Sequence, residues 1–314
     1  LKIKKKRIAV VGHIRPDGDS LGSVVALVRT LNNIGLESVG IINDNIPKKL
    51  ITFVKDTPFI NIKDLVPENY YLISVDCADY KRLGLQVCNA FKKVFLNIDH
   101  HITNKIYAKN NIIKEKSSAT AEILAGIFLD LDFKIDKITA EALYLGIVTD
   151  TGNFCFPSTN INTFKIIQSL IQFGASSHDV TSRLYNNESY GRIRLVQKFL
   201  KSLEFKLFNR VCIGYLTKDD FKESGAGIDE SEGLVDYPRS IRGVDIGVLI
   251  EQRDEMLKIS LRAKEDRYRV DEIAKAFGGG GHSCASGVNY KGDILDFKGK
   301  LVKEIENKFN LLHD

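Results

Sequence analysis

Short apolar runs alternate with helix-like patterns through the first half of the chain. Four of these runs read as buried strands because each is short, mostly apolar and followed by polar residues; they cover residues 7–13, 37–44, 70–78 and 92–100. Residues 19–35 instead place apolar side chains at helical spacing and finish at a glycine, which is a helix stop signal. This alternation predicts an α/β fold whose first domain has a mostly parallel sheet with helices on both faces.

The pattern changes near residue 183, where a polar stretch passes into a helical one that ends near residue 205. Before this point, further helices are expected at residues 118–131, 138–150 and 161–174. The expected domains are a first domain over residues 1–185, a helical linker over 186–205, and a smaller C-terminal α/β domain over 206–314.

The second domain is expected to mix strands and helices. Residues 210–217 predict a strand, and residues 245–263 predict two strands around a polar turn. They are followed by a short helix at 269–277, a glycine-rich loop at 278–287 and a closing helix at 295–312. A chain of 314 residues is long enough for two such domains.

Composition narrows the class of protein. Hydrophobic residues make up 44% of the chain and charged residues 27%. No apolar run reaches the ~18 residues of a membrane span, so we expect a globular protein without a membrane partner. The basic residues Lys2, Lys4, Lys5, Lys6 and Arg7 lead into an apolar run too short for a signal peptide, and we interpret them as the approach to a strand.

The five cysteines are scattered and form no CxxC pair. This spacing argues against a disulfide framework and a zinc–thiolate site, and it is typical of a protein from a reducing cytoplasm. Cys77 follows Asp76 in the sequence, and we expect it to be a small packed residue and not a nucleophile. The net charge of +5 is compatible with a polyanionic partner but does not require one.

Acids and histidines follow the ends of the expected strands. They are His13, Asp17 and Asp19 after the first strand, Asp76 after the third, Asp99, His100 and His101 after the fourth, and Asp150 after a later apolar stretch. In an open parallel sheet, ligands bind beyond the carboxyl ends of the strands. We therefore expect these four groups to converge at one edge of the sheet.

Carboxylates brought together in this way repel one another, and burying them without partners is costly. A mixture of carboxylates and imidazoles, without thiolates, suits manganese or another divalent first-row metal better than calcium, which takes oxygen ligands. The donors outnumber the ligands of one ion, so we expect two ions that share a carboxylate, as in two-metal phosphoryl transfer. A single Asp in such a place is commonly a cap or turn residue, but four clusters at corresponding positions favour a metal site.

Four motifs resemble those of the DHH phosphoesterases, in the same order along the chain: HIRPDGDSLGS, VDCAD, IDHH and GIVTDTGNF. The later stretch FGGGGHSCASG is similar to the substrate-binding motif of the DHH-associated domain, and EGLVDYPRSIRGVDIGVLIEQ is similar to the rest of that domain. The resemblance spans nearly the whole chain. Within the superfamily it is closest to the bifunctional oligoribonucleases and phosphatases of 3′-phosphoadenosine 5′-phosphate (pAp).

This resemblance implies two Mn²⁺ ions, for which Mg²⁺ or Co²⁺ are substitutes. The implied ligands are His13, Asp17 and Asp76 for one ion, and Asp19, Asp76, His100 and Asp150 for the other, so that Asp76 bridges. Asp99 is expected to orient a neighbouring histidine, and His101 to face the scissile phosphate. The expected catalytic residues are therefore His101, Asp99 and Asp76.

The expected substrate-binding residues of the second domain lie in and near its glycine-rich motif. Arg262 and His282 are expected to grip a terminal phosphate, and Gly279, Gly280 and Gly281 to let backbone amides approach it closely. A run of glycines alone indicates only a flexible turn. The residues around it make the binding motif the stronger interpretation.

In the first domain, Ser118 and Thr120 either bind phosphate at the start of a helix or simply cap that helix, and the sequence leaves both interpretations open. Tyr107 and Phe154 are candidates for stacking on a base, although ordinary packing explains each of them better. No metal ligand implied by the resemblance is missing, which argues against a non-catalytic nucleotide or RNA binder.

These expectations favour an exonuclease that acts on very short RNA oligonucleotides and also dephosphorylates pAp, because both substrates present a terminal phosphate on a nucleotide. The alternative is a phosphodiesterase of cyclic-di-AMP or of the linear dinucleotide pApA. Inorganic pyrophosphatases share the first four motifs but lack the glycine-rich second domain, and exonucleases of long DNA carry extra domains. The resemblance also suggests a homodimer.

Overall fold

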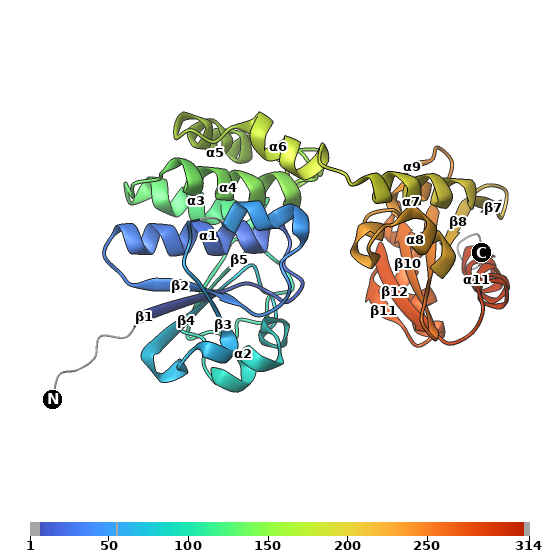
Figure 1. Ribbon diagram of the computed structural model, residues 1–314, viewed down its shortest axis with the longest axis horizontal. Coiled ribbons are helices and arrows are strands. Elements are labelled where there is room, and N and C mark those ends of the chain that lie inside the picture. The colour runs from blue at the N-terminus through green and yellow to red at the C-terminus, as the bar shows by residue number, and fades with distance from the viewer. Residues whose placement is uncertain (1–6, 55, 311–314) are drawn as a thin grey trace. The chain divides into compact units, whose positions relative to one another are not determined.

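The computed structural model describes residues 7–54 and 56–310, and the chain divides into two compact units (Figure 1). The first unit is Leu1–Asn187 and the second is Glu188–Asp314. Each unit has its own six-stranded sheet and its own hydrophobic core. Four residues of the basic cluster, Lys2, Lys4, Lys5 and Lys6, lie outside the described part of the chain.

All strands of the first sheet are parallel, in the order β3-β2-β1-β4-β5-β6. They are β1 (Arg7–Val11), β2 (Ser38–Ile42), β3 (Phe59–Asn61), β4 (Tyr70–Val75), β5 (Leu96–Asp99) and β6 (Asn110–Ile113). The predicted parallel sheet is confirmed, although its two short edge strands, β3 and β6, do not appear in the sequence pattern. The strand order reverses between β1 and β4, and such a reversal is the usual place for a ligand site.

Helices cover both faces of this sheet, as predicted. They are α1 (Gly18–Asn33), α2 (Leu85–Ala90), α3 (Thr120–Asp130), α4 (Lys137–Asp150), α5 (Ile161–Gln172) and α6 (Ser177–Tyr185), with 3-10 turns η1 (Lys48–Val54), η2 (Ile62–Asp64), η3 (Pro67–Asn69) and η4 (Tyr80–Leu83). One face packs α1, α3 and α4 on strand residues such as Val10 and Val75, and α5 and α6 lie over α4 (Figure 1). The other face packs α2 and several 3-10 turns on residues such as Val11 and Leu72.

Helices α1 and α4 run side by side (Figure 1), and they approach too closely for a side chain at several glycines, including Gly22 and Gly146. A Cβ atom at Gly22 of α1 would lie 2.2 Å from the carbonyl oxygen of Ala142 in α4. A Cβ atom at Gly146 of α4 would lie 2.7 Å from Oδ1 of Asp19 and 2.6 Å from Cβ of Ala121. Glycine at these positions therefore lets the starts of α1 and α3 meet the end of α4.

The second sheet has the order β11-β12-β10-β9-β8-β7, and among its described strands only β8 and β9 pair in parallel. The strands are β7 (Glu204–Lys206), β8 (Val211–Leu216), β9 (Ile246–Arg253), β10 (Met256–Ala263), β11 (Gly280–His282) and β12 (Ala285–Tyr290). The helices are α7 (Tyr190–Lys201), α8 (Lys218–Ser224), α9 (Asp236–Ser240), α10 (Val270–Ala276) and α11 (Ile294–Asn310), with 3-10 turns η5 (Ile228–Ser231) and η6 (Asp266–Tyr268). A second α/β unit is thus confirmed.

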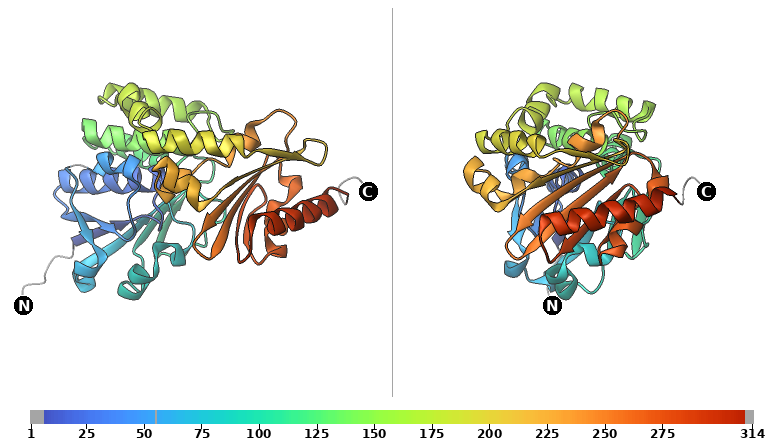
Figure 2. Two further views of the ribbon diagram at one scale, coloured as in Figure 1. Left: turned by 45° about the vertical axis from the view of Figure 1, so that its right-hand side comes forward. Right: turned by 90° about the vertical axis from the view of Figure 1, so that its right-hand side faces the viewer.

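Helices also pack on both faces of the second sheet. On one face, Ile273 of α10 and Phe297 of α11 pack on strand residues such as Leu261 (Figure 2). On the other face, Leu195 and Phe199 of α7 pack with residues of β8, β9 and α8. No helix within the described ranges is both long and apolar enough to cross a bilayer.

The glycine-rich segment expected as a loop contains a short strand instead. Residues Gly280–His282 form β11, which pairs antiparallel with β12. A Cβ atom at Gly279 would lie 2.2 Å from the carbonyl oxygen of Gly287, and one at Gly281, where φ is +152°, would lie 2.4 Å from that of Ala285. The glycines therefore allow the chain to lie tightly against β12. Because glycine has a weak strand propensity, the sequence pattern does not predict this strand.

Candidate active site

The structure brings the predicted acids and histidines together beyond the carboxyl ends of β1, β4 and β5. The residues form overlapping groups whose ligand atoms lie within 4.8 Å of one another in each group: His13, Asp17 and Asp76; Asp19, His100 and Asp150; and Asp76, His100 and His101. Asp19 stands in the first turn of α1 and Asp150 at the last residue of α4. The sheet edge and two helix ends thus position the whole cluster.

The first group centres on the buried imidazole of His13. Its Nε2 lies 3.4 Å from Oδ2 of Asp76 and 3.5 Å from Oδ2 of Asp17. Its Nδ1 lies 2.8 Å from the carbonyl oxygen of Ile14, which requires a proton on Nδ1 and leaves Nε2 to face the carboxylates. Burial lowers the pKa of His13, but the carboxylates of Asp17 and Asp76 outweigh burial and raise the pKa to about 10.

The second group joins Asp19, His100 and Asp150. Nε2 of His100 lies 3.1 Å from Oδ2 of Asp150 and 3.7 Å from Oδ1 of Asp76. Burial, followed by the carboxylates of Asp76 and Asp17, raises the pKa of Asp150 to about 6 despite the opposing effect of His100. Burial and neighbouring carboxylates also raise the pKa of Asp19 well above its ordinary value. Asp76 thus turns one oxygen toward each group.

Asp19 also caps a helix that is distant in the sequence. Its Oδ2 accepts the backbone N–H of Thr120 at 2.7 Å, and its Oδ1 accepts that of Ala121 at 2.9 Å. The N-cap residue of α3, Ala119, has no side chain that could do this. Asp19 therefore supplies the cap of α3 that one of the two open interpretations assigned to Ser118 or Thr120.

The hydroxyls of Ser118 and Thr120 are both buried and both already bonded. Ser118 Oγ donates to Oε2 of Glu122 at 2.5 Å, and Thr120 Oγ1 donates to Oδ1 of Asp76 at 3.3 Å. Thr120 therefore contacts the acidic cluster directly, whereas Ser118 points into a buried network with Glu122 and Thr163. Neither hydroxyl acts as the side-chain cap of α3.

Asp99 pairs with His101, which belongs to the third donor group. Nδ1 of His101 donates to Oδ1 of Asp99 at 2.7 Å, and the backbone N–H of His100 donates to the same oxygen at 2.9 Å. Burial acts to raise the pKa of Asp99, but the bond to His101 lowers it; the same bond raises the pKa of His101. The Nδ1–H of His101 is bonded to Asp99, and Nε2 has no hydrogen-bond partner within the described part of the chain.

Arg262 and His282 occupy one row of the second sheet. Arg262 of β10 and His282 of β11 are both paired in register with Ala285 of β12. Residues paired across a sheet share a face, so the two side chains stand on one face, two strand spacings or about 10 Å apart. The adjacent row on this face holds Gly280, Gly287 and Ser260. The two polar side chains therefore lie on either side of Ala285, beside a row in which two of the three residues are glycines.

Comparison with protein families decides the class of this chain. Residues 7–147 match the DHH family, N-terminal domain, and residues 209–310 match the DHHA1 domain. This chain carries a DHH domain followed by a DHHA1 domain. The resemblance inferred from its motifs is confirmed.

The DHH protein is similar to bacterial relatives over most of its length. It is 28% identical over 299 residues to the bifunctional oligoribonuclease and PAP phosphatase NrnA of Thermus thermophilus, covering 94% of this chain and 88% of the relative. It is 28% identical over 297 residues to the Bacillus subtilis protein of the same name, covering 90% of each. The crystal structure of an exopolyphosphatase-related protein from Bacteroides fragilis aligns with a TM-score of 0.90 at 26% identity, covering 98% of this chain and 94% of that one.

The donor set of the DHH domain fits divalent cations. Carboxylates and imidazoles meet at one place, and among the described residues no lysine or arginine forms an ion pair with Asp17, Asp19, Asp76 or Asp150. The raised pKa values of Asp19 and Asp150 come from burial and from neighbouring carboxylates. A divalent ion would offset the charge of these carboxylates, and neutral imidazole with carboxylate is a common donor combination for first-row metals.

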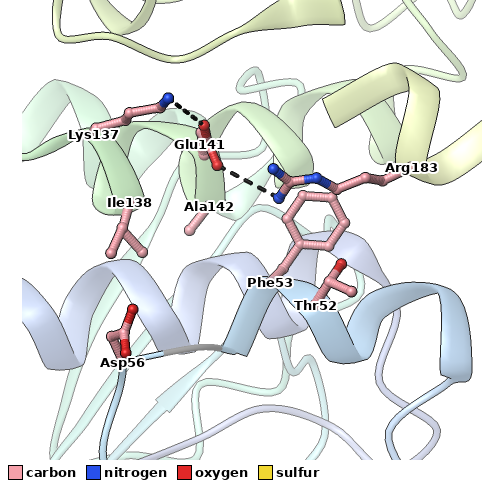
Figure 3. Close-up of a pocket in the computed structure, with 8 residues that line it drawn as sticks. All are labelled: Thr52, Phe53, Asp56, Lys137, Ile138, Glu141, Ala142 and Arg183. Carbon is pink, nitrogen blue, oxygen red and sulfur yellow. Dashed lines mark ion pairs between the residues drawn. The ribbon is translucent and has the colours of Figure 1, made fainter. Parts of the chain in front are cut away.

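The DHH domain also has a pocket of about 430 Å³, and Figure 3 shows the residues that line it. It is lined by Thr52, Phe53, Asp56, Lys137, Ile138, Glu141, Ala142 and Arg183. Glu141 pairs with Lys137 and with Arg183 at 3.7 Å each. Because residues 141 and 150 are both on α4, the helical rise puts this pocket about 13 Å from Asp150 along the helix. The pocket is therefore not part of the predicted site.

Proposed function

We propose that this DHH protein is a metal-dependent phosphoesterase that removes mononucleotides from very short RNA and dephosphorylates pAp. The observation that carries the proposal is the pair of donor groups that meet at Asp76, whose Oδ2 faces His13 and whose Oδ1 faces His100. The substrates are inferred from the relatives in Thermus thermophilus and Bacillus subtilis, both named bifunctional oligoribonuclease and PAP phosphatase.

The residues proposed to hold the metals fall into two sets that share Asp76. They are His13, Asp17 and Asp76 for one ion, and Asp19, Asp76, His100 and Asp150 for the other. Two Mn²⁺ ions, with Mg²⁺ or Co²⁺ as substitutes, would supply positive charge that acidifies water and neutralises phosphate oxygens. The mixed carboxylate and imidazole donors support this choice of metals.

His101 is the proposed general acid, and Asp99 is proposed to hold its imidazole in place. The bond from His101 Nδ1 to Asp99 holds a proton on Nδ1 and favours the protonated ring, as the raised pKa of His101 indicates. Protonated Nε2 would then donate to a phosphate oxygen or to the leaving oxygen of the substrate. Water provides the attacking oxygen, so the proposal requires no covalent intermediate.

The DHHA1 domain is proposed to hold the terminal phosphate of the nucleotide. Arg262 would bind it bidentately and His282 would bind from the other side of Ala285. Backbone groups of Gly279, Gly280 and Gly281 would line the same anion. Very short RNA and pAp both carry such a phosphate, which is why one site would serve both substrates.

A substrate panel tests the proposal. Purified protein with Mn²⁺ is offered RNA of about two to five nucleotides, pAp, pApA, cyclic-di-AMP and pyrophosphate, and the products are separated by chromatography. We expect mononucleotides from the short RNA and AMP from pAp, and no hydrolysis when a chelator replaces the metal. Preferred hydrolysis of cyclic-di-AMP would overturn the substrate assignment, and tight RNA binding without hydrolysis would overturn the enzymatic one.

A further inference from the structure

Asn104 contacts the oxygen of Asp99 that His101 does not use, and the sequence pattern does not indicate it as a site residue. Its Nδ2 donates to Oδ2 of Asp99 at 2.6 Å, the oxygen that His101 does not use. The same Nδ2 donates to Oδ1 of Asn97 at 2.8 Å. Asn104 is thus the third side chain in a row of hydrogen bonds that leads through Asp99 to His101.

The orientation of the Asn104 amide is fixed by its neighbours. Its Oδ1 accepts the backbone N–H of Ile106 at 2.7 Å, so this atom must be the carbonyl oxygen. The two protons of Nδ2 are then directed to Asp99 and Asn97. A flipped amide would place an oxygen against the Asp99 carboxylate and would lose every one of these bonds.

A further layer of polar groups holds the arrangement from behind. Asn97 is fully buried, and its Nδ2 donates to Oγ of Ser74 at 2.9 Å. The hydroxyl of Tyr107 lies 2.9 Å from both Ser74 Oγ and the carbonyl oxygen of Cys77. Because these groups are all paired, the network is rigid and keeps Asn104 in one position.

We infer that Asn104 is a positioning residue that fixes the Asp99 carboxylate so that His101 presents its Nε2 to the substrate. With Oδ2 held by Asn104, Oδ1 remains in place to accept the Nδ1 proton of His101. Without the Asn104 amide, Asp99 would be held only through Oδ1, by the backbone N–H of His100 and by His101. The carboxylate could then turn about that oxygen, and the imidazole would lose its fixed direction. This inference rests on the proposed function, in which His101 faces the leaving oxygen.

The chemical step defines what Asn104 should affect. The oxygen of water forms a bond to phosphorus and releases one proton to solvent, the bond from phosphorus to the leaving oxygen breaks, and the Nε2 proton of His101 moves to that leaving oxygen. The neutral imidazole then regains a proton from solvent. An alkoxide such as a ribose oxygen needs this proton, whereas p-nitrophenolate leaves without one.

The test compares two substrates that differ in the leaving group. The dinucleotide pApA has a ribose leaving group, and the p-nitrophenyl ester of thymidine 5′-monophosphate has an acidic one. Asn104→Ala and the isosteric Asn104→Asp are measured on both, with Asn111→Ala as a matched control. Asn111 bonds to the backbone of Ala108 in the loop before β6 and does not touch Asp99.

We expect kcat for pApA to fall about 10- to 100-fold in both Asn104 variants, while kcat for the p-nitrophenyl ester changes little and KM is unchanged. The control should match the unaltered protein on both substrates. Equal losses on the two substrates, or no loss on pApA, would overturn the positioning role. If the unaltered protein hydrolyses neither substrate, the proposed function itself is wrong, so the two failures are distinguishable.

Discussion

Asp19 and Thr120 stand 101 residues apart in the sequence, yet Oδ2 of Asp19 accepts the backbone N–H of Thr120 at 2.7 Å. The same carboxylate belongs to the donor group with His100 and Asp150. One side chain therefore both caps α3 and contributes charge to the candidate metal site. A helix N-terminus favours a nearby negative charge, which gives Asp19 partial compensation in its buried position.

The two tasks of Asp19 should separate in two variants. Asp19→Asn and Asp19→Ala both remove the charge, but only asparagine keeps an oxygen that can accept an N–H from the first turn of α3. We expect Asp19→Ala to be less stable than Asp19→Asn by about 1 kcal/mol, the usual cost of a lost cap. Urea unfolding in chelator measures the difference. Equal free energies of unfolding would show that α3 does not depend on this cap.

Asp76 is the residue whose charge the site should need most. Its φ is +51°, a left-handed conformation that asparagine adopts more readily than alanine, so Asp76→Asn is the fair substitution. We expect Mn²⁺-dependent hydrolysis to fall by more than about 100-fold, beyond the effect of losing an outer partner. Calorimetric titration should show weakened Mn²⁺ binding, while the melting temperature in chelator should not decrease.

The control for Asp76 is Asp79→Asn, a few residues further along the chain. Asp79 caps η4 and pairs with the exposed Lys105, outside the acidic cluster. We expect the Asp79→Asn substitution to leave Mn²⁺ binding and hydrolysis unchanged. Full activity in Asp76→Asn, or equal loss in both variants, would remove Asp76 from the role of shared ligand.

Without metal, the protein is expected to lose stability as the pH rises. The pKa of Asp150 is about 6 in the fold, against an ordinary value of 3.8, so the folded state binds more protons than the unfolded state between these values. Its contribution is complete below pH 3.8 and is lost as the pH rises through 6. His13 acts in the same direction at higher pH, because its pKa is raised from 6.5 to about 10. The pKa of Asp17 is lowered in the fold, so its contribution to stability changes only in more acidic solution.

Melting temperatures in chelator, measured across this pH range, test the titration of Asp150. We expect Asp150→Asn to lose the part of the pH dependence that lies between about 4 and 6. With saturating Mn²⁺, the melting temperature of the unaltered protein should instead increase as the pH rises, because metal and protons compete for the same oxygens. A pH dependence in chelator that is identical in the variant would exclude Asp150 as its source.

Arg262 should matter for nucleotide binding more than for the chemical step. Arg262→Ala is expected to raise KM for pAp about tenfold or more, the effect of losing one charge-assisted contact, with a smaller change in kcat. Lys258→Ala is the matched control, because Lys258 lies on the same strand and the same face. An unchanged KM for pAp in Arg262→Ala, or an equal increase in the control, would exclude the phosphate contact.

The parts of this protein that follow from local sequence could be predicted, and those that depend on tertiary contacts could not. The convergence of His13, Asp76 and His100 follows from the rule that parallel strands end at one edge. The cap from Asp19 to α3 could not be found, because the local signal pointed to Ser118 and Thr120. The short edge strands β3 and β6 do not stand out because runs of 3 and 4 residues are too short to show a strand pattern, and β11 does not because glycine carries little strand preference.

Asn104 was missed for a related reason. An asparagine that follows two histidines in a turn looks like an ordinary turn residue. Its role becomes visible only when β4, β5 and the loop before β6 bring Asn97, Asp99 and Tyr107 around it. A signal was present in the spacing of His101 and Asn104, whose backbones form a turn with a 3.1 Å hydrogen bond.

The glycine contact between α1 and α4 sets a limit for anyone who wishes to engineer a more robust version of this enzyme. Replacing a helical glycine by alanine commonly adds up to about 1 kcal/mol of stability. At Gly22 and Gly146 the added methyl group would push apart the helices that carry Asp19 and Asp150. Gly126 in α3 has open space around its missing Cβ, so it offers the same gain without moving the candidate metal site.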